Sequence, residues 1–229
     1  MSVEVFVDYM SSPARAVLAL CRIGKINIKI NSLRVFKGEN AQEKYLKLNP
    51  LWTIPFIIDH DNNDFRLTES NAIMKYLLKT RNGSFKESLY PKDPVIVSKI
   101  DEYLDWHHSN LRKAAWYIFK NINPDAPAVS GYIKEKLDND FLDSILTLEN
   151  YFLKDDKFIG GADEMSIADI GAFFELYELV ILDFDFSPYP KISKWMKTIL
   201  NIPEMKDANK EFIDGLKRFL NVDDIKPRF

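Results

Sequence analysis

The sequence predicts an α/β region followed by an all-α region. In residues 1–80, short runs with strand-like alternation and runs with helical spacing follow one another in the order βαβαββα. A polar stretch containing glycine and proline then interrupts the pattern over residues 81–92. From residue 93 to residue 229, apolar residues recur only at helical spacing. We therefore expect an α/β domain in 1–80, a linker in 81–92 and an all-α domain in 93–229.

The first three elements are expected to form a βαβ unit. The segment VEVFVDY alternates early and is rich in valine, as a strand should be. Apolar residues at helical spacing follow from Pro13 to Gly24, and glycine commonly ends a helix. Residues 26–31, INIKIN, alternate strictly and predict a second strand. A strand, a short helix and a strand in about 30 residues are typical of a parallel βαβ unit.

Four further elements complete the first region. Residues 41–48 predict a polar helix, and the runs IPFII and FRLT predict two strands joined by the turn-rich segment DHDNND. A helix is expected from Glu69 to Lys79. Pro55 stands at the front of the third strand, where proline normally disrupts pairing. We therefore expect a special backbone there, such as a cis bond between Ile54 and Pro55.

The second region begins with a helix start at Asp93, which is placed to cap the helix that opens at Pro94. Ser166 and Asp169 form a short-armed capping box for a later helix, and we assign this motif a structural role. The five expected helices are Pro94–Lys120, Val129–Leu153, Ser166–Leu182, Lys191–Leu200 and Glu204–Phe219.

Composition excludes several classes of protein. With 46% apolar and 28% charged residues, the chain is expected to be globular rather than disordered. The net charge of −3 argues against nucleic acid as the main partner, because a phosphate backbone selects a basic surface. The longest stretch without a charged residue, Leu48 to Ile58, is far shorter than the roughly 18 apolar residues of a membrane span. No signal peptide is recognised, and the single cysteine, Cys21, points to a cytoplasmic protein.

No metal site is expected. His107 and His108 are adjacent on a helix, so their side chains diverge by about 100° and cannot act as paired ligands. His60 lies in a polar turn. Cys21 lies on the apolar side of a helix, and we interpret it as a small core residue rather than a nucleophile.

Two serines, Ser11 and Ser12, stand side by side before the first helix. With Pro13 as the first helical residue, Ser12 is the expected cap, and its hydroxyl should accept the N–H of Ala14 or Arg15. The Ser11 hydroxyl then remains free over the helix N-terminus, where partial positive charge and free N–H groups favour an anion. The alternative interpretation is that both serines are ordinary turn residues.

A second polar turn precedes the helix at residue 69. Thr68, Glu69 and Ser70 bring a carboxylate, hydroxyl groups and free amides together at a helix N-terminus. Such a site suits a ligand that carries both an ammonium group and a carboxylate. The alternative is that these residues form an ordinary helix cap.

Together these segments resemble the glutathione transferase family, and most closely its theta class. YMSSPARAV is similar to the serine-type catalytic turn, NPLWTIPFI to the cis-proline segment and LTESNAIMKYL to the γ-glutamyl-binding turn. YPKDP resembles the domain junction, DEYLDWHH the start of the first helix of the α domain, and MSIADI the capping motif of that domain. The resemblance covers nearly the whole chain. It implies a thioredoxin-like N-terminal domain followed by an all-α helical domain.

The resemblance also implies how glutathione would bind. Ser11 would be the catalytic residue, with its hydroxyl steadying the glutathione thiolate. Ser70 would hold the γ-glutamyl carboxylate, and Glu69 would face the ammonium group. The main chain of Ile54 would pair with the cysteinyl part.

Asn40 and Thr53 would lie near the glycyl carboxylate of glutathione. Many theta-class relatives carry Lys and His at these two positions, so the neutral side chains here should hold that carboxylate less tightly. Arg15 and Arg112 are interpreted as salt-bridged structural residues. The electrophile would bind beside the sulfur, between the two domains. The candidate wall residues of that pocket are Tyr9, Met10, Leu111, Ala115, Trp116 and Phe119. The last four stand at helical spacing, so core packing is the alternative interpretation for each of them.

The implied function is that of a glutathione transferase. Glutathione would be the co-substrate, small hydrophobic electrophiles would accept its thiolate, and no prosthetic group is expected. Peroxide reduction and dehalogenation are further chemistries that the same thiolate can perform. The alternative is a non-catalytic module of the same fold, which binds a ligand or assembles with a partner. The resemblance also implies a homodimer that has neither nucleic acid nor a membrane as partner.

Overall fold

A mixed sheet of four strands forms one layer of the molecule. The computed structural model describes residues 2–122, 131–154 and 158–229. The strands lie in the order β2-β1-β3-β4, with β1 parallel to β2 and β3 antiparallel to both β1 and β4. Their bounds are β1 (Val3–Val7), β2 (Ile28–Ser32), β3 (Phe56–Asp59) and β4 (Phe65–Thr68). The predicted parallel βαβ unit is thus confirmed.

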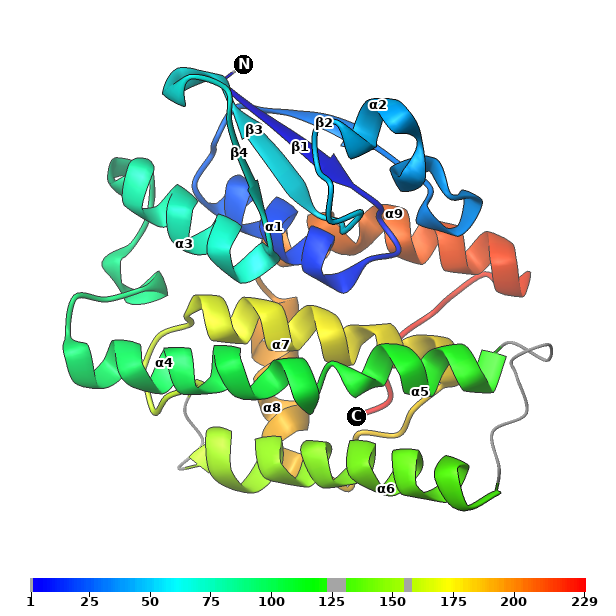
Figure 1. Ribbon diagram of the computed structural model, residues 1–229. Helices are drawn as coiled ribbons and strands as arrows, with labels where there is room; N and C mark the ends of the chain where they lie inside the picture. The colour runs from blue at the N-terminus through cyan, green and yellow to red at the C-terminus, as the bar shows by residue number, and fades with distance from the viewer. Residues whose placement is uncertain (1, 123–130, 155–157) are drawn as a thin grey trace.

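Helices cover both faces of the sheet. Figure 1 shows α1 (Ser12–Ile23) and α3 (Ser70–Thr80) between the sheet and the helical region, with α2 (Glu43–Leu46) on the opposite side of the sheet. Alternation along β1 turns Val5 into the core that contains α1, whereas Phe6 packs in a smaller core on the other face. The predicted order βαβαββα is the order observed.

The rest of the described chain is helical. Helix α7 lies at its centre, with ten of its eleven residues buried, and it packs across the layers against α1. Figure 1 shows α4 and α7 next to the α1 and α3 layer, with α6 farthest from the sheet. The helices of this region are α4 (Pro94–Trp106), α5 (Lys113–Ile122), α6 (Gly131–Thr147), α7 (Ile167–Tyr177), α8 (Pro190–Leu200) and α9 (Pro203–Leu220).

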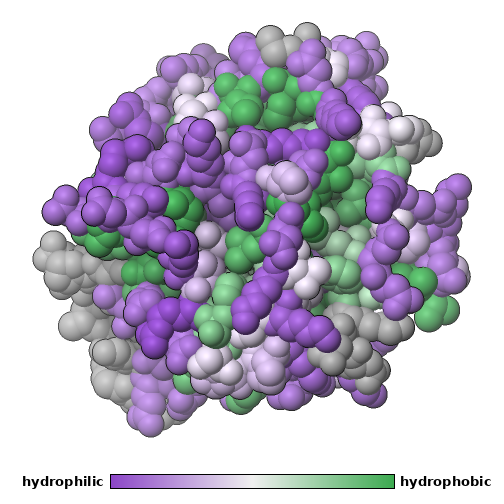
Figure 2. Space-filling view, turned by 180° about the vertical axis from the view of Figure 1, so that it is seen from behind, coloured by the Kyte–Doolittle hydropathy of each residue, from purple (hydrophilic) through white to green (hydrophobic). Residues whose placement is uncertain are grey.

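One hydrophobic core joins the two regions. It runs without interruption from β1 and α1 of the α/β layer, through residues such as Leu18, to Tyr103 and Phe173 of the helical region. Figure 2 shows the face turned away from the viewer of Figure 1: it is mostly hydrophilic, with smaller hydrophobic areas near its top and through its middle. The shared core fixes the two regions against each other, and therefore fixes any site between them.

One predicted helix is wrong in its extent. The expected helix Pro94–Lys120 is broken, because α4 ends at Trp106, a 3₁₀ turn covers His107–Ser109 and α5 begins at Lys113. Asn110 leaves the helical conformation, with φ −125° and ψ −93°, and its side-chain amide donates to the carbonyl of Trp106 at 2.8 Å. Serine and asparagine side chains compete in this way with the hydrogen bonds of a helix.

The other predicted helices agree with the structure where it describes them. Val129, the expected start of the second helix, lies outside the described residues. The end of that helix is π-helical over Leu148–Phe152. The predicted helix Ser166–Leu182 is α7, followed by a 3₁₀ turn over Glu178–Leu182.

The capping box at the start of α7 is confirmed. The Ser166 hydroxyl accepts the N–H of Ala168 at 3.2 Å, and Asp169 accepts the N–H of Ser166 at 2.8 Å. Asp169 also accepts the N–H of Ile159 and the indole N–H of Trp195, both at 2.9 Å. The motif therefore ties α7 to α8 and to the loop before it, which supports its structural role.

We expect Ser166→Ala to lower the free energy of unfolding by about 1 kcal/mol, because the variant loses a helix cap in a buried position. Urea denaturation followed by circular dichroism measures this change. Ser98→Ala is the matched control, since Ser98 is an exposed residue within α4 and alanine favours helices. Equal stabilities of the two variants would contradict the assigned capping role.

Candidate functional site

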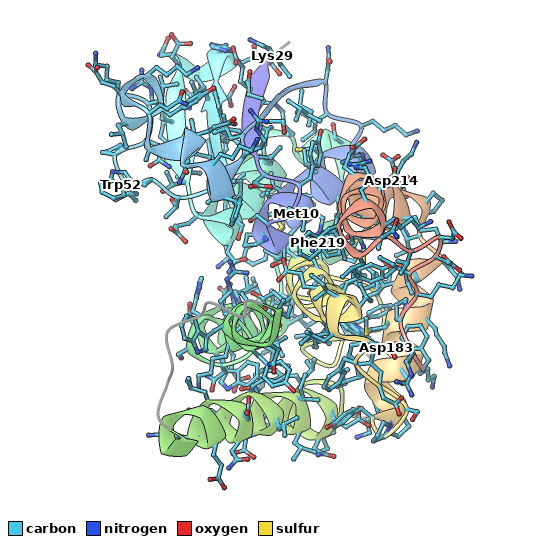
Figure 3. All side chains as sticks on the ribbon, turned by 90° about the vertical axis from the view of Figure 1, so that its right-hand side faces the viewer. Met10, Lys29, Trp52, Asp183, Asp214 and Phe219 are labelled. Carbon is cyan, nitrogen blue, oxygen red and sulfur yellow. The ribbon has the colours of Figure 1, made fainter. Side chains whose placement is uncertain are left out.

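A cavity of about 600 Å³ lies between the α/β layer and the helical region. Its walls come from the β1–α1 turn, the loops at 35–40 and 52–54, helix α5, the turn after α7 and helix α9. Figure 3 places Met10 near the centre of the junction and Trp52 at the outer edge of the α/β layer. Because both residues line the cavity, it extends from the junction to that edge.

The β1–α1 turn is held by Asp8. One carboxylate oxygen of Asp8 accepts the N–H of Met10 at 2.9 Å, and the other accepts the N–H of Val35 at 2.8 Å. The carbonyl of Asp8 accepts the N–H of Ser11 at 3.0 Å. Asp8 thus fixes the turn and also attaches it to the loop that forms the next wall of the cavity.

The two serines have different surroundings from those expected. Ser11, not Ser12, is the N-cap of α1, and its side chain accepts no N–H from the helix. Ser12 is the first helical residue, and its hydroxyl accepts from Nη1 of Arg112 at 2.8 Å. The predicted capping role of Ser12 is therefore wrong, because the helix begins one residue earlier and Pro13 takes its second position.

The Ser11 hydroxyl is available, as expected. Ser11 lines the cavity, and in residues 2–122, 131–154 and 158–229 its hydroxyl has no hydrogen-bond partner. It lies at the N-terminus of α1, where the helix dipole favours negative charge. An anionic atom in this cavity can therefore accept a hydrogen bond from a hydroxyl that no other group engages.

A buried ion pair supports the serine turn from the helical region. Arg15 has no exposed surface and lies 3.3 Å from Oε1 of Glu178. The guanidinium also donates to the carbonyl of Tyr9 at 2.8 Å, and the same Glu178 oxygen accepts the N–H of Ser12 at 2.8 Å. The turn is therefore held at both ends by this pair. The guanidinium also stacks on the Phe212 ring at 3.8 Å.

Burial shifts the pKa values of both members of the pair. Removal from water lowers the pKa of Arg15 to about 10, against the opposing effect of Glu178. Burial raises the pKa of Glu178, and Arg15 is the main group that opposes the rise. Arg15 stays protonated at neutral pH, so removal of its partner would leave a buried cation.

Three of the predicted glutathione residues line the same cavity as Ser11. They are Asn40, Thr53 and Ile54. The peptide bond between Ile54 and Pro55 is cis, as expected. The side-chain amide of Asn40 donates to the carbonyl of Trp52 at 2.7 Å, which joins the two loops. One N–H of the Asn40 amide is therefore already engaged in a hydrogen bond within the protein.

The other two predicted residues do not line this cavity. Glu69 is the N-cap of α3, with φ +67°, and its exposed side chain accepts no N–H of the helix. Ser70 is the first residue of α3 and is partly buried. The strand register pairs Thr68 with Phe56, so this turn leaves the sheet next to the start of β3, two residues beyond Ile54.

The predicted cavity wall is correct in part. Met10 and Ala115 line the cavity, whereas Leu111 lies in the core and Trp116 is exposed. Tyr9 packs against the main core, and the side chain of Phe119 lies outside the described residues. The apolar wall residues that the sequence analysis missed include Ile118, Ile181 and Phe212.

Arg112 and Glu178 also line the cavity, next to Ser11. Arg112 was interpreted as a salt-bridged structural residue, and it does lie 3.9 Å from Oε1 of Glu175. Glu178 was not singled out. Glu178 stands three residues after Glu175, so both carboxylates lie on one side of the α7 segment. This spacing is the signal in the sequence that could have identified Glu178 as a site residue.

Other chemical groups are placed away from the cavity. Cys21 is buried in the core, and burial raises the pKa of its thiol to about 12. Within the described residues, no group of three or more His, Cys, Asp or Glu side chains is arranged to hold a metal ion. No helix in that part of the chain has the length and apolar character needed to cross a membrane.

Family models match both regions of the chain. Residues 10–80 match the glutathione S-transferase N-terminal domain, and residues 127–203 match the C-terminal domain of the same family. The chain is 32% identical to glutathione S-transferase T1 of Arabidopsis thaliana, over 86% of this chain and 82% of the relative. It is 30% identical to human glutathione S-transferase theta-1, over 87% of this chain and 82% of that protein.

Two further comparisons define the extent of the similarity. A match at 32% identity to Arabidopsis glutathione S-transferase T2 covers 96% of this chain but only 38% of that longer protein. The crystal structure of human glutathione transferase theta-2 in complex with glutathione superimposes with a TM-score of 0.85 and 25% identity. That alignment covers 96% of this chain and 90% of the human chain.

Proposed function

The chain belongs to the glutathione S-transferase family, and on that premise we propose that it joins the thiolate of glutathione to small hydrophobic electrophiles. Glutathione is the co-substrate. The thiol proton passes to solvent, the sulfur attacks an electrophilic carbon and a carbon–sulfur bond forms. The bond from that carbon to the leaving group breaks, and the leaving group departs with the electron pair.

One observation carries this proposal. The Ser11 hydroxyl has no protein partner in the described residues, and it faces the same cavity as Asn40, Thr53 and Ile54. A hydroxyl in that position suits the glutathione sulfur. The main chain of Ile54 would pair with the cysteinyl part, and Asn40 and Thr53 would lie near the glycyl carboxylate.

The start of α3 is proposed to bind the other end of the tripeptide. The Ser70 hydroxyl and the free N–H groups of the first turn would take the γ-glutamyl carboxylate. The exposed carboxylate of Glu69 would face the ammonium group. In this arrangement residues 1–80 hold glutathione, residues 93–229 provide most of the electrophile pocket, and residues 81–92 link the two.

The chemistry requires only a modest contribution from Ser11. A free cysteine thiol has a pKa near ~8.5, so little thiolate is present at neutral pH. A hydrogen bond to a charged group contributes roughly 1.5–3 kcal/mol, and one pKa unit corresponds to about 1.36 kcal/mol. One hydroxyl donor therefore lowers the thiol pKa by about one to two units. No general base is needed, and the protein acts by electrostatic preorganisation.

The lining of the cavity supports apolar electrophiles. Met10, Ala115, Ile118, Ile181 and Phe212 line the same cavity as Ser11. The same thiolate would also support reduction of hydroperoxides or displacement of halide. We further propose a cytoplasmic homodimer with a role in detoxification, on the similarity to theta-class proteins.

A non-catalytic carrier of the same fold is the second candidate. The side chains of Asn40 and Thr53 are neutral, and the Asn40 amide already donates to the Trp52 carbonyl. Both facts favour weak binding of the glycyl carboxylate, but they leave Ser11 intact. The carrier hypothesis therefore differs from the enzyme hypothesis in turnover, not in fold.

We expect the protein to be retained on immobilised glutathione, and either to conjugate a model halide or epoxide or to reduce a model hydroperoxide to its alcohol while glutathione is oxidised to its disulfide. The free hydroxyl at Ser11 is the physical reason for the expected turnover, since it stabilises the attacking sulfur, whereas retention rests on the Ile54 main chain and the α3 turn. Retention on the resin and the loss of free thiol measure the two properties separately. Retention without turnover of any electrophile would favour the carrier.

A further inference from the structure

A buried histidine lies between the two turns proposed to bind glutathione. His107 begins the 3₁₀ turn after α4 and is 6% exposed. Its ring stacks on the Tyr103 ring, with centroids 5.7 Å apart and an interplanar angle of 12°. One ring nitrogen, Nδ1, lies 3.1 Å from Oε1 of Glu175, and the other, Nε2, lies 3.0 Å from Nδ2 of Asn71. The imidazole therefore bridges α3 and α7.

The chemistry of the partners sets the direction of both hydrogen bonds. A carboxylate accepts hydrogen bonds, so Nδ1 of His107 carries the hydrogen and donates to Glu175. The amide nitrogen of Asn71 donates, so Nε2 of His107 accepts. A neutral imidazole provides one donor and one acceptor, and here both are used.

The Asn71 contact acts on the proposed γ-glutamyl site. Asn71 is the second residue of α3 and directly follows Ser70. Its bond to His107 therefore fixes the first turn of α3 against the helical region. The Ser70 hydroxyl and the free N–H groups belong to that same turn.

The Glu175 contact connects His107 to the α1 turn at Ser11. Oε1 of Glu175 lies 3.9 Å from Nη1 of Arg112, and that nitrogen donates to the Ser12 hydroxyl at 2.8 Å. The carbonyl of His107 also accepts the N–H of Arg112 at 3.0 Å, which fixes the chain where α5 begins. His107 is thus connected through Glu175 and Arg112 to the residue next to Ser11.

We propose that His107 is a positioning residue that couples the α3 turn at Ser70 to the α1 turn at Ser11, and so holds the two ends of the glutathione site in register. The role rests on the proposed function, because it acts on glutathione binding. His107 is not among the residues that line the cavity. Its effect passes through Asn71 on one side and Arg112 on the other.

A double-mutant cycle on glutathione affinity tests this role. His107→Leu removes both hydrogen bonds, and Asn71→Ala removes one of them. We expect each variant to raise the dissociation constant of glutathione, measured by calorimetry, about fivefold. The dissociation constant of the double variant should not exceed the larger of the two single-variant values, because both changes break the same connection.

Two further variants separate positioning from general stability. His107→Gln keeps a donor and an acceptor and should recover part of the affinity, and it takes the place of His107→Leu in the cycle if the leucine variant does not fold. His60→Gln is the matched control, because it is the same substitution at an exposed histidine that follows Asp59, at the other end of β3 from Ile54. Its glutathione affinity should equal that of the wild type. At saturating glutathione, kcat of the Asn71 variant should remain within about twofold of the wild type.

Three outcomes would overturn the role of His107. Unchanged affinity in both single variants would do so, and so would fully additive losses in the double variant. Failure of the wild-type protein to bind glutathione would remove this role together with the proposed function. Calorimetric titration of the wild-type protein with glutathione separates this last outcome from the first two.

Discussion

Replacing Ser11 with alanine is expected to lower kcat for conjugation about 10- to 100-fold, which corresponds to the loss of one hydrogen bond to a charged group. The dissociation constant of glutathione should change little, because the Ile54 main chain and the α3 turn still hold the tripeptide. Steady-state rates with a model halide and calorimetric titration with glutathione measure the two quantities. The loss should appear in kcat, since the interaction forms with the thiolate.

The neighbouring serine provides the control for this experiment. Ser12→Ala removes a hydroxyl of the same size from the same turn, but that hydroxyl is occupied by Arg112. Its effect on kcat should be much smaller than that of Ser11→Ala. Near-normal turnover of Ser11→Ala, or equal losses in the two variants, would remove the special role of Ser11.

Replacing Glu178 with alanine is expected to reduce the free energy of unfolding by about 3–5 kcal/mol. The reason is that Arg15 stays charged and buried without its carboxylate partner. For a chain of this size such a loss lowers Tm by roughly 10 °C. Thermal denaturation followed by circular dichroism measures the change.

Two variants serve as references for the Glu178 experiment. Glu178→Gln retains an oxygen that can accept the N–H of Ser12 but loses the charge, so it should be destabilised less than the alanine variant. Glu211→Ala removes an exposed carboxylate on α9 and should leave Tm close to that of the wild type. If Glu178→Ala were as stable as Glu211→Ala, the buried pair would not support the serine turn.

The sequence predicts the α/β region well because its signals are local. The alternation in β1 places Val5 and Phe6 on opposite faces, and Gly24 ends α1 as expected. The cis bond at Ile54 follows from a proline at a position that strands normally exclude. The capping box at Ser166 and Asp169 is equally local. Each of these features depends on residues a few positions apart.

The errors arise where the decisive contact is distant in the sequence. No proline or glycine marks the break after α4, and the hydrogen bond of the Asn110 side chain to Trp106 cannot be read from apolar spacing. Because α5 begins anew at Lys113, spacing extended from Pro94 could not decide between the cavity wall and the core for Leu111, which the structure places in the core.

The arrangement around the serine turn depends on still more distant residues. The Ser12 hydroxyl bonds to Arg112, 100 residues away, and Arg15 pairs with Glu178, 163 residues away. Local helix chemistry alone assigned the cap to Ser12, whereas the fold assigns that hydroxyl to Arg112. The prediction for Ser11 did not depend on this error, because either arrangement leaves its hydroxyl unengaged.

Titration of the sulfur of bound glutathione tests the central claim most directly. The thiolate absorbs in the ultraviolet, so absorbance of the complex against pH gives the pKa of the bound thiol. For the wild type we expect a pKa between about 6.5 and 7.5, one to two units below the ~8.5 of a free thiol. For Ser11→Ala we expect a return toward the free value, and an identical pKa in the two proteins would contradict the proposed mechanism.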